Sequence, residues 1–225
     1  MWSIVVAGGS GRRFGEPKQF SSLGGRPVLA WAVEACRRVS DGVVLVVPAD
    51  VDADDPAYPA HAGADVVVAG GATRADSVRH GLDAVPVAAD IVVVHDAARP
   101  LAPPALFAAV LAALREEGVV GAVPGLAPND TIKVVDEAMN VTSTLDRTAL
   151  VAVQTPQAFR AVALRAAHAH AGTGTGSGGA ATDDAMLVEA AGGRVRVVPG
   201  HDDNLKITTP DDLATAERLL AERAP

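Results

Sequence analysis

Short apolar runs rich in β-branched residues recur along the chain, separated by longer stretches of mixed polarity. The runs are continuous rather than alternating, which is typical of strands buried on both faces of a sheet. Strand candidates of this kind cover Ile4–Ala7, Val43–Val47, Val66–Ala69, Ile91–Val94 and Val119–Val123. Helix candidates fill gaps between them at Pro27–Arg38, Thr73–Ala84 and Pro103–Glu117. This alternation predicts an α/β fold with a Rossmann-like, mostly parallel sheet flanked by helices on both faces.

The pattern changes in the second half of the chain. Asn129–Val135 and Val141–Leu145 flank a turn near residues 137–140, which predicts a β-hairpin. A hairpin inserted into a parallel sheet either caps its edge or projects as an arm, and a second copy of the chain is the simplest partner for an arm. We therefore expect a single domain, residues 1–225, with a β-arm at about residues 128–150.

The remaining segments continue the α/β pattern. Gly172–Gly179 has the composition of a flexible surface loop. Beyond it we expect a helix capped near Asp183, strands at Arg194–Val198 and Asn204–Thr208, and a last helix from Pro210.

Composition and charge exclude several function classes. Hydrophobic residues make up 49% of the 225 residues, which is enough for a sizeable core. The net charge of -8 argues against nonspecific binding to nucleic acid or to a membrane surface. Cys36 is the only cysteine, so we expect a core residue, no intrachain disulfide and no cysteine metal site. With no long apolar stretch and no cleavable leader, we expect a cytoplasmic protein.

A glycine-rich loop follows the first strand candidate: Gly8-Gly9-Ser10-Gly11-Arg12-Arg13, with Lys18-Gln19 shortly after. Glycines let backbone N–H groups approach phosphate oxygens, and Arg and Lys neutralise their charge. A Walker A loop needs a Gly-Lys pair, which is missing, and a dinucleotide fingerprint needs glycine at position 14, which is Phe. The loop therefore indicates a different phosphate ligand, the alternative being a plain turn with solvated arginines.

Two further polar segments follow strands, at Gly70–Ser77 and His95–Pro100. Ligands of parallel sheets bind at the carboxyl ends of the strands, so these segments should gather with the glycine loop. Asp96 is a reasonable Mg²⁺ ligand there, although a helix cap or an ion pair with Arg99 is an alternative role. The spacing of the histidines predicts no His metal site, and no Gly-x-Ser-x-Gly elbow occurs.

Taken together, these motifs resemble the 2-C-methyl-D-erythritol 4-phosphate cytidylyltransferases of the non-mevalonate isoprenoid pathway. The matching segments run in order along nearly the whole chain: Ala7–Arg13 with Lys18-Gln19, Gly71–Ser77, His95–Pro100, Asp130–Lys133, Asp146-Arg147, Thr155–Gln157, Thr182-Asp183 and Asn204–Thr208. The resemblance implies a nucleotidyltransferase fold and transfer of a cytidylyl group from CTP to 2-C-methyl-D-erythritol 4-phosphate, with Mg²⁺ as cofactor and release of pyrophosphate.

The resemblance also implies roles for particular residues. Arg13 and Lys18 match catalytic positions that stabilise the charge on the α-phosphate, and Asp96 matches the metal position. Substrate-binding positions are matched by Arg147, Lys206, Thr131 and Thr155. Nucleotide-binding positions are matched by Ala7, Gly8, Gly9, Gly11, Gly71, Arg74, Ser77 and Ala97. In the family the arm reaches across a homodimer, so Thr131 and Arg147 are expected to complete the partner's site.

Two positions depart from the family pattern, and several alternatives stay open. Val6 stands where the family often has proline, and Ala72 stands where an acid often follows the glycine pair. Lys206 could be ordinary solvated surface, and Arg147 could simply pair with a neighbouring acid. The acceptor could be ribitol 5-phosphate or another polyol phosphate. A noncatalytic nucleotide-binding subunit and a dinucleotide-dependent oxidoreductase are more distant alternatives.

Overall fold

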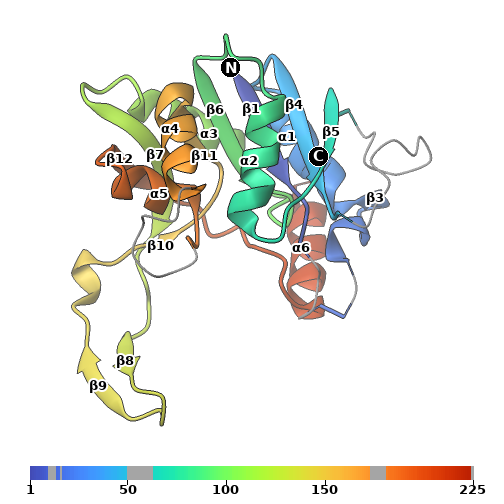
Figure 1. Ribbon diagram of the computed structural model, residues 1–225. Coiled ribbons are helices and arrows are strands. Elements are labelled where there is room, and N and C mark those ends of the chain that lie inside the picture. The colour runs from blue at the N-terminus through green and yellow to red at the C-terminus, as the bar shows by residue number, and fades with distance from the viewer. Residues whose placement is uncertain (10–13, 16, 50–62, 173–180, 224–225) are drawn as a thin grey trace.

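A sheet of eight strands forms the centre of the molecule (Figure 1). The computed structural model describes residues 1–9, 14–15, 17–49, 63–172 and 181–223. The strand order is β10-β7-β11-β6-β1-β4-β5, and β12 pairs with β7 as well. The strands are β1 (Trp2–Val6), β4 (Gly42–Val47), β5 (Val66–Ala69), β6 (Ile91–Asp96), β7 (Val119–Leu126), β10 (Ala152–Val153), β11 (Gln157–Arg160) and β12 (Arg194–Pro199).

Most strand pairs in this sheet are parallel, as the continuous apolar runs predict. β1 pairs in parallel with β4 and β6, β4 with β5, and β12 with β7. Two strands are exceptions: β11 is antiparallel to both β6 and β7, and the short β10 is antiparallel to β7. The sequence did not predict β11, because four residues after a proline carry no periodic signal.

Helices cover both faces of the sheet (Figure 1). The helices are α1 (Val28–Arg37), α2 (Arg74–Ala84), α3 (Pro104–Ala113), α4 (Ala161–Gly172), α5 (Asp184–Ala190) and α6 (Pro210–Glu222). Successive residues of a strand point to opposite faces. Val5 accordingly packs with Leu29 of α1 and Phe107 of α3, whereas Ile4 packs with Val78 of α2 and Leu164 of α4. Cys36 is buried in the first of these clusters, as expected.

A third apolar cluster fixes the last helix beside the glycine loop. Ile207, just before α6, and Ala216 within it are buried against Leu23 and Val28. Leu23 belongs to a small hairpin of β2 (Ser22–Leu23) and β3 (Arg26–Pro27), which follows the 3-10 helix η1 (Lys18–Phe20). Helix α6 begins at a capping box in which Thr209 and Asp212 satisfy each other's backbone N–H groups. The cluster therefore holds residues 18–20 and 206–209 at the same end of the molecule.

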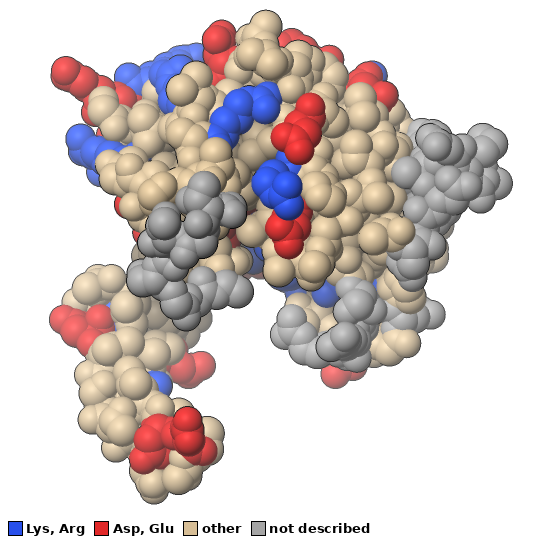
Figure 2. Space-filling view, in the orientation of Figure 1, with Lys and Arg blue, Asp and Glu red and all other residues tan. Residues whose placement is uncertain are grey.

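The expected hairpin forms an arm that projects from the body (Figures 1 and 2). Its strands are β8 (Lys133–Val135) and β9 (Val141–Thr144), which pair with each other, and the 3-10 helix η3 (Arg147–Ala149) follows. Several of its apolar side chains face solvent in the single chain, among them Met139, which is 75% exposed, and Val141, which is 58% exposed.

The prediction of a strand at Asn204–Thr208 is wrong. Residues 204–208 are all described, yet they form no regular element, because their contacts are made to loops rather than to a strand edge. Ile207 N–H donates to Ala98 O, and Asn204 O accepts from the Arg99 guanidinium. Most of the expected loop at residues 172–179 lies outside the described residues. Among the helices of the described ranges, none is long and apolar enough to cross a membrane.

Candidate active site

A cavity of about 590 Å³ opens at the carboxyl ends of β1, β5 and β6. Four segments far apart in the sequence meet there: the loop after β1, the loop between β5 and α2, the end of β6 and the residues before α6. The cavity is lined by Val6, Ala7, Gly8, Gly9, Phe14, Lys18, Gln19, Gly71, Ala72, Thr73, Arg74, Ser77, Asp96, Ala97, Ala98, Lys206 and Thr208. This is the position at which a doubly wound parallel sheet binds ligands.

The glycine loop forms one wall of the cavity. A Cβ atom on Gly8 would lie 3.3 Å from Ser77 Oγ, so the glycine loop lies close to the start of α2 at this point. Gln19 fixes the loop from the other side, because its Nε2 donates to Gly9 O at 3.2 Å. The sequence-predicted residues Gly11 and Arg13 lie outside the described residues, whereas Lys18 lines the cavity.

The second wall is the glycine pair before α2. A Cβ atom on Gly71 would lie 2.3 Å from Asp76 Cβ, so only glycine fits there. Ser77 Oγ donates to Thr73 O at 3.0 Å and accepts the Gly71 N–H at 3.1 Å. Thr73 and Asp76 form the capping box of α2. Ser77, expected to read the nucleotide, thus also sets the shape of the loop that it faces.

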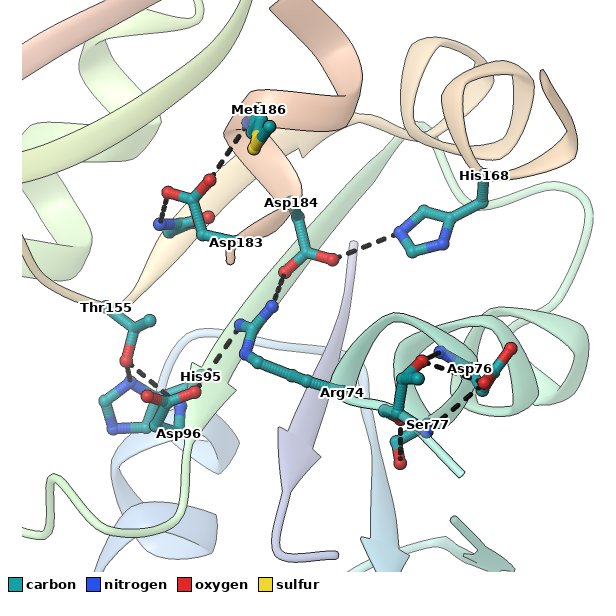
Figure 3. A network of polar contacts seen from close by, with 12 residues as sticks. Arg74, Asp76, Ser77, His95, Asp96, Thr155, His168, Asp183, Asp184 and Met186 are labelled. Atoms are coloured by element: carbon teal, nitrogen blue, oxygen red, sulfur yellow. Dashed lines mark hydrogen bonds and ion pairs between the residues drawn. The ribbon is translucent and has the colours of Figure 1, made fainter. Parts of the chain in front are cut away.

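Asp96 stands at the end of β6 between two cations. Lys206 Nζ donates to Asp96 Oδ2 at 2.6 Å. Arg74 Nη2 lies 3.4 Å from Asp96 Oδ1, and Figure 3 shows this contact. Burial alone would raise the pKa of the Asp96 carboxyl, but the positive charges of Arg74 and Lys206 hold that pKa below its ordinary value. Asp96 therefore stays ionised. The sequence left open an ion pair between Asp96 and Arg99. Among the described residues, the ion pairs of Asp96 are instead made with Arg74 and Lys206.

A chain of hydrogen bonds through Thr155 and His95 holds the backbone of Asp96 in place. Thr155 Oγ1 accepts the Asp96 N–H at 3.0 Å and lies 3.0 Å from His95 Nδ1. His95 Nε2 lies 3.1 Å from Arg99 O, and because a carbonyl only accepts, Nε2 carries the proton and Nδ1 accepts from the Thr155 hydroxyl. Burial lowers the pKa of His95 to about 4, so the ring is neutral at pH 7. His95 packs against Phe107 on the opposite face from the cavity, as its strand position predicts.

Lys206 reaches Asp96 because residues 204–207 are tied to the end of β6. Arg99 Nη1 donates to Asn204 O at 2.6 Å, and Asn204 Nδ2 donates to Thr155 O at 2.8 Å. The Ile207 N–H donates to Ala98 O at 2.8 Å. These bonds explain how a lysine outside any strand takes a fixed place at the cavity, with 41% of its side chain still exposed.

Of the remaining predicted residues, two line the cavity and one is buried behind it. Ala7 and Ala97 line the cavity, but their N–H groups already bond to Val46 O and Val6 O, so a ligand meets their carbonyls and methyl groups. Thr155 is buried, with its hydroxyl directed to Asp96 and His95.

The two arm residues are not brought to the cavity within one chain. Thr131 and Arg147 are both exposed, the first shortly before β8 and the second at the start of η3. Arg147 Nη1 donates to Asn129 O at 2.6 Å, so its guanidinium bonds to a backbone carbonyl, whereas the expected alternative was a pair with a neighbouring acid.

A divalent cation at this site would have one protein carboxylate. Within the described residues there is no group of three or more His, Cys, Asp or Glu side chains placed to hold a metal ion. Mg²⁺ usually takes one or two carboxylates, several waters and phosphate oxygens of the substrate. Asp96, ionised and directed into the cavity, fits that donor set.

Sequence reasoning missed several residues that support the site. No role at the site was predicted for Gln19, His95, Thr208 or Asp184. All four belong to the matched motifs or directly follow one. His95 and Asp184 act from outside the cavity, and their contacts join segments that the sequence separates by many residues. For Asp184 the sequence did offer one indication, since this residue directly follows Asp183, the predicted cap of a helix.

Comparisons with known proteins agree on one family. The sequence model of IspD, 2-C-methyl-D-erythritol 4-phosphate cytidylyltransferase, matches residues 1–222. The chain is 47% identical to 2-C-methyl-D-erythritol 4-phosphate cytidylyltransferase of Rhodococcus jostii, covering 99% of this chain and 96% of that protein. It is 46% identical to bifunctional enzyme IspD/IspF of Clavibacter michiganensis subsp. michiganensis, covering 98% of this chain but only 54% of that protein.

Solved structures give the same result. The crystal structure of 2-C-methyl-D-erythritol 4-phosphate cytidylyltransferase from Thermus thermophilus superposes with a TM-score of 0.80 at 37% identity, covering 97% of this chain and 98% of that one. A 4-diphosphocytidyl-2C-methyl-D-erythritol synthase from Anaerococcus prevotii superposes with a TM-score of 0.81 at 31% identity, covering 98% and 97% of the two chains.

Proposed function

Because the chain belongs to the IspD family of 2-C-methyl-D-erythritol 4-phosphate cytidylyltransferases, we propose that it transfers the cytidylyl group of CTP to 2-C-methyl-D-erythritol 4-phosphate. The products are 4-diphosphocytidyl-2-C-methyl-D-erythritol, an isoprenoid precursor, and pyrophosphate. The observation that carries this proposal is the meeting of the two glycine loops with Lys18, Asp96 and Lys206 around one cavity. A site that only bound a nucleotide would not require this set of charged groups.

The reaction is an in-line displacement at phosphorus. A phosphate oxygen of the acceptor attacks the α-phosphorus of CTP, a new P–O bond forms, and the bond from the α-phosphorus to the pyrophosphate leaving group breaks. The attacking group is a phosphate oxygen that is ionised at pH 7, so no general base is needed. The protein contributes positioning and stabilisation of the extra negative charge in the transition state.

The residues of the cavity can be given roles on this basis. The loop at Gly8 and Gly9 faces the triphosphate, and the loop at Gly71 and Ser77 faces the cytosine and ribose. Lys18 stabilises the charge on the α-phosphate, and we assign the same role to Arg13, which lies outside the described residues. Lys206 holds the acceptor phosphate, for which its exposed ammonium has N–H donors beyond the one directed to Asp96.

We include Mg²⁺ as the cofactor, held by Asp96 and by oxygens of the triphosphate. Bound there, it would neutralise phosphate charge and orient the triphosphate. Chelation by EDTA should abolish turnover and addition of Mg²⁺ should restore it; turnover that persists in EDTA would contradict this part of the proposal.

We further propose that two chains form a homodimer through the arm, with Thr131 and Arg147 completing the partner's site. The exposed apolar side chains of β8 and β9, the projection of the arm away from the sheet (Figure 1) and the lack of arm residues among those lining the cavity support this arrangement.

Subunit complementation tests the shared site. Arg147→Ala damages the arm and leaves the cavity of its chain intact, whereas Asp96→Asn does the reverse. Mixed and re-associated, the two inactive variants should recover about a quarter of wild-type activity, because half of the dimers are mixed and each carries one intact site. No recovery would mean that Arg147 acts within its own chain or not at all.

Pyrophosphate release tests the function itself. The purified protein is incubated with Mg²⁺, CTP and either methylerythritol 4-phosphate or ribitol 5-phosphate. We expect release with the first acceptor. Release with ribitol 5-phosphate alone would replace the acceptor, and no release with either would refute the enzymatic function. Single-domain organisation and a cytoplasmic location are further parts of the proposal, the second testable by cell fractionation.

A further inference from the structure

An ion-pair chain leads from Asp96 in the cavity to the interior of the molecule (Figure 3). Arg74, the first residue of α2, lies between Asp96 and Asp184, the first residue of α5. Arg74 Nη1 donates to Asp184 Oδ2 at 2.8 Å, whereas its Nη2 lies 3.4 Å from Asp96 Oδ1. The shorter bond of this cavity arginine is thus made to a carboxylate whose side chain is only 1% exposed.

Asp184 is itself held in place by a second partner. His168 Nε2, on α4, lies 3.1 Å from Asp184 Oδ1. An ionised carboxylate only accepts hydrogen bonds, so His168 donates to it from Nε2. With one oxygen bound by Arg74 and the other by His168, the buried carboxylate has a single orientation. Removing either partner would leave part of a buried charge uncompensated.

The distribution of charge along the chain explains why Asp184 matters to the cavity. Asp96 is shared by two cations, Arg74 and Lys206, and Arg74 is shared by two carboxylates. Burial alone would lower the pKa of Arg74, but Asp184 and Asp96 raise it above its ordinary value. If Asp184 lost its charge, the planar guanidinium would turn to Asp96 and form a two-pronged pair with it. The long 3.4 Å contact of Arg74 with Oδ1 would become a full hydrogen bond, while Lys206 continues to hold Oδ2.

We propose that Asp184, oriented by His168, is a positioning residue that holds Arg74 back from Asp96 and so keeps the Asp96 carboxylate available to magnesium-bound CTP. This inference rests on the proposed function. It assigns a role in the reaction to two buried residues that are not among those lining the cavity.

Asp184→Asn tests the inference, because asparagine keeps the shape of the side chain and removes its charge. We expect the affinity for CTP in Mg²⁺, measured by calorimetry, to fall about tenfold, the size of one charge-assisted hydrogen bond. The KM for CTP should rise by the same factor, while the KM for the acceptor phosphate stays within about twofold of wild type. A merely structural role would lower the unfolding temperature without separating the two KM values.

The neighbouring residue supplies a matched control. Asp183→Asn makes the same change of charge at the helix cap of α5, and asparagine caps helices as well as aspartate does. Asp183 accepts from Met186 N–H and Gln157 Nε2, and Gln157 can turn its Oε1, which has no partner in the described part of the chain, toward the new amide. We expect this variant to bind CTP within about twofold of wild type. Equal losses in the two variants would overturn the inference.

Two further variants keep the test decisive if Asp184→Asn folds poorly. His168→Gln can place an N–H near the position of Nε2 and should retain CTP affinity, whereas His168→Leu removes the donor and should lower it. In an Arg74→Met background, Asp184→Asn should have no further effect on CTP affinity, and a second tenfold loss would show that Asp184 does not act through Arg74. A wild-type protein that binds CTP but transfers nothing would contradict the proposed function and leave the binding comparison valid.

Discussion

Replacing Thr155 with valine tests how the structure holds Asp96. The Thr155 hydroxyl accepts the Asp96 N–H and donates to His95 Nδ1, both at 3.0 Å, and all three residues are buried. Valine matches the shape of threonine but has neither a donor nor an acceptor. One N–H and one ring nitrogen would therefore lose their partners in the interior.

The size of the effect follows from these two groups. A buried polar group left without a partner costs about 1–3 kcal/mol, so the free energy of unfolding should fall by about 3 kcal/mol in Thr155→Val. For a chain of this length that corresponds to a drop in Tm of roughly 6–12 °C. Because the backbone of Asp96 loses its support, kcat should fall as well.

Urea denaturation and steady-state kinetics of Thr155→Val and Thr155→Ser provide the assay. Serine retains the hydroxyl, so its unfolding free energy should stay within about 1 kcal/mol of wild type, which covers the loss of one buried methyl group. The reasoning is refuted if Thr155→Val unfolds like wild type and changes only the KM for the acceptor. That result would make Thr155 a direct substrate ligand, the role that the family resemblance implied.

Three shorter predictions concern other parts of the molecule. Lys18→Ala should lower kcat much more than it weakens CTP binding, and equal losses would mean that the lysine serves ground-state binding only. Gly71→Ala should lower CTP affinity at least about tenfold, because a Cβ atom there would lie 2.3 Å from Asp76 Cβ; unchanged affinity in calorimetry would contradict the close approach of Gly71 to the first turn of α2. Burial raises the pKa of Cys36 to about 12, so iodoacetamide at about pH 8 should label the thiol only after unfolding; rapid labelling of the folded protein would contradict its burial.

The sequence predicted the parallel part of the fold because burial on both faces leaves continuous apolar runs. β1, β4, β5 and β6 all lie where such runs occur. The prediction was wrong at residues 204–208, where polar and apolar residues alternate but the segment does not join a sheet. It also missed β11, whose pairing with β6 and β7 depends on contacts made far along the chain.

The site was predictable to the extent that its residues directly follow strands. Gly8, Gly71 and Asp96 meet at the cavity because the carboxyl ends of β1, β5 and β6 lie together. The supporting residues were not predictable in this way. His168 and Asp184 lie on helices with ordinary patterns, and only the packing of α4 against both α2 and α5 places Asp184 between His168 and Arg74.

Direct detection of the transferred group tests the central claim. The protein, Mg²⁺, an equal mixture of the four nucleoside triphosphates and both polyol phosphates are combined, and the products are identified by mass. The account predicts one major product, 4-diphosphocytidyl-2-C-methyl-D-erythritol, in an amount equal to the pyrophosphate released. A product carrying another nucleoside, or the absence of any nucleotidyl polyol, would contradict it.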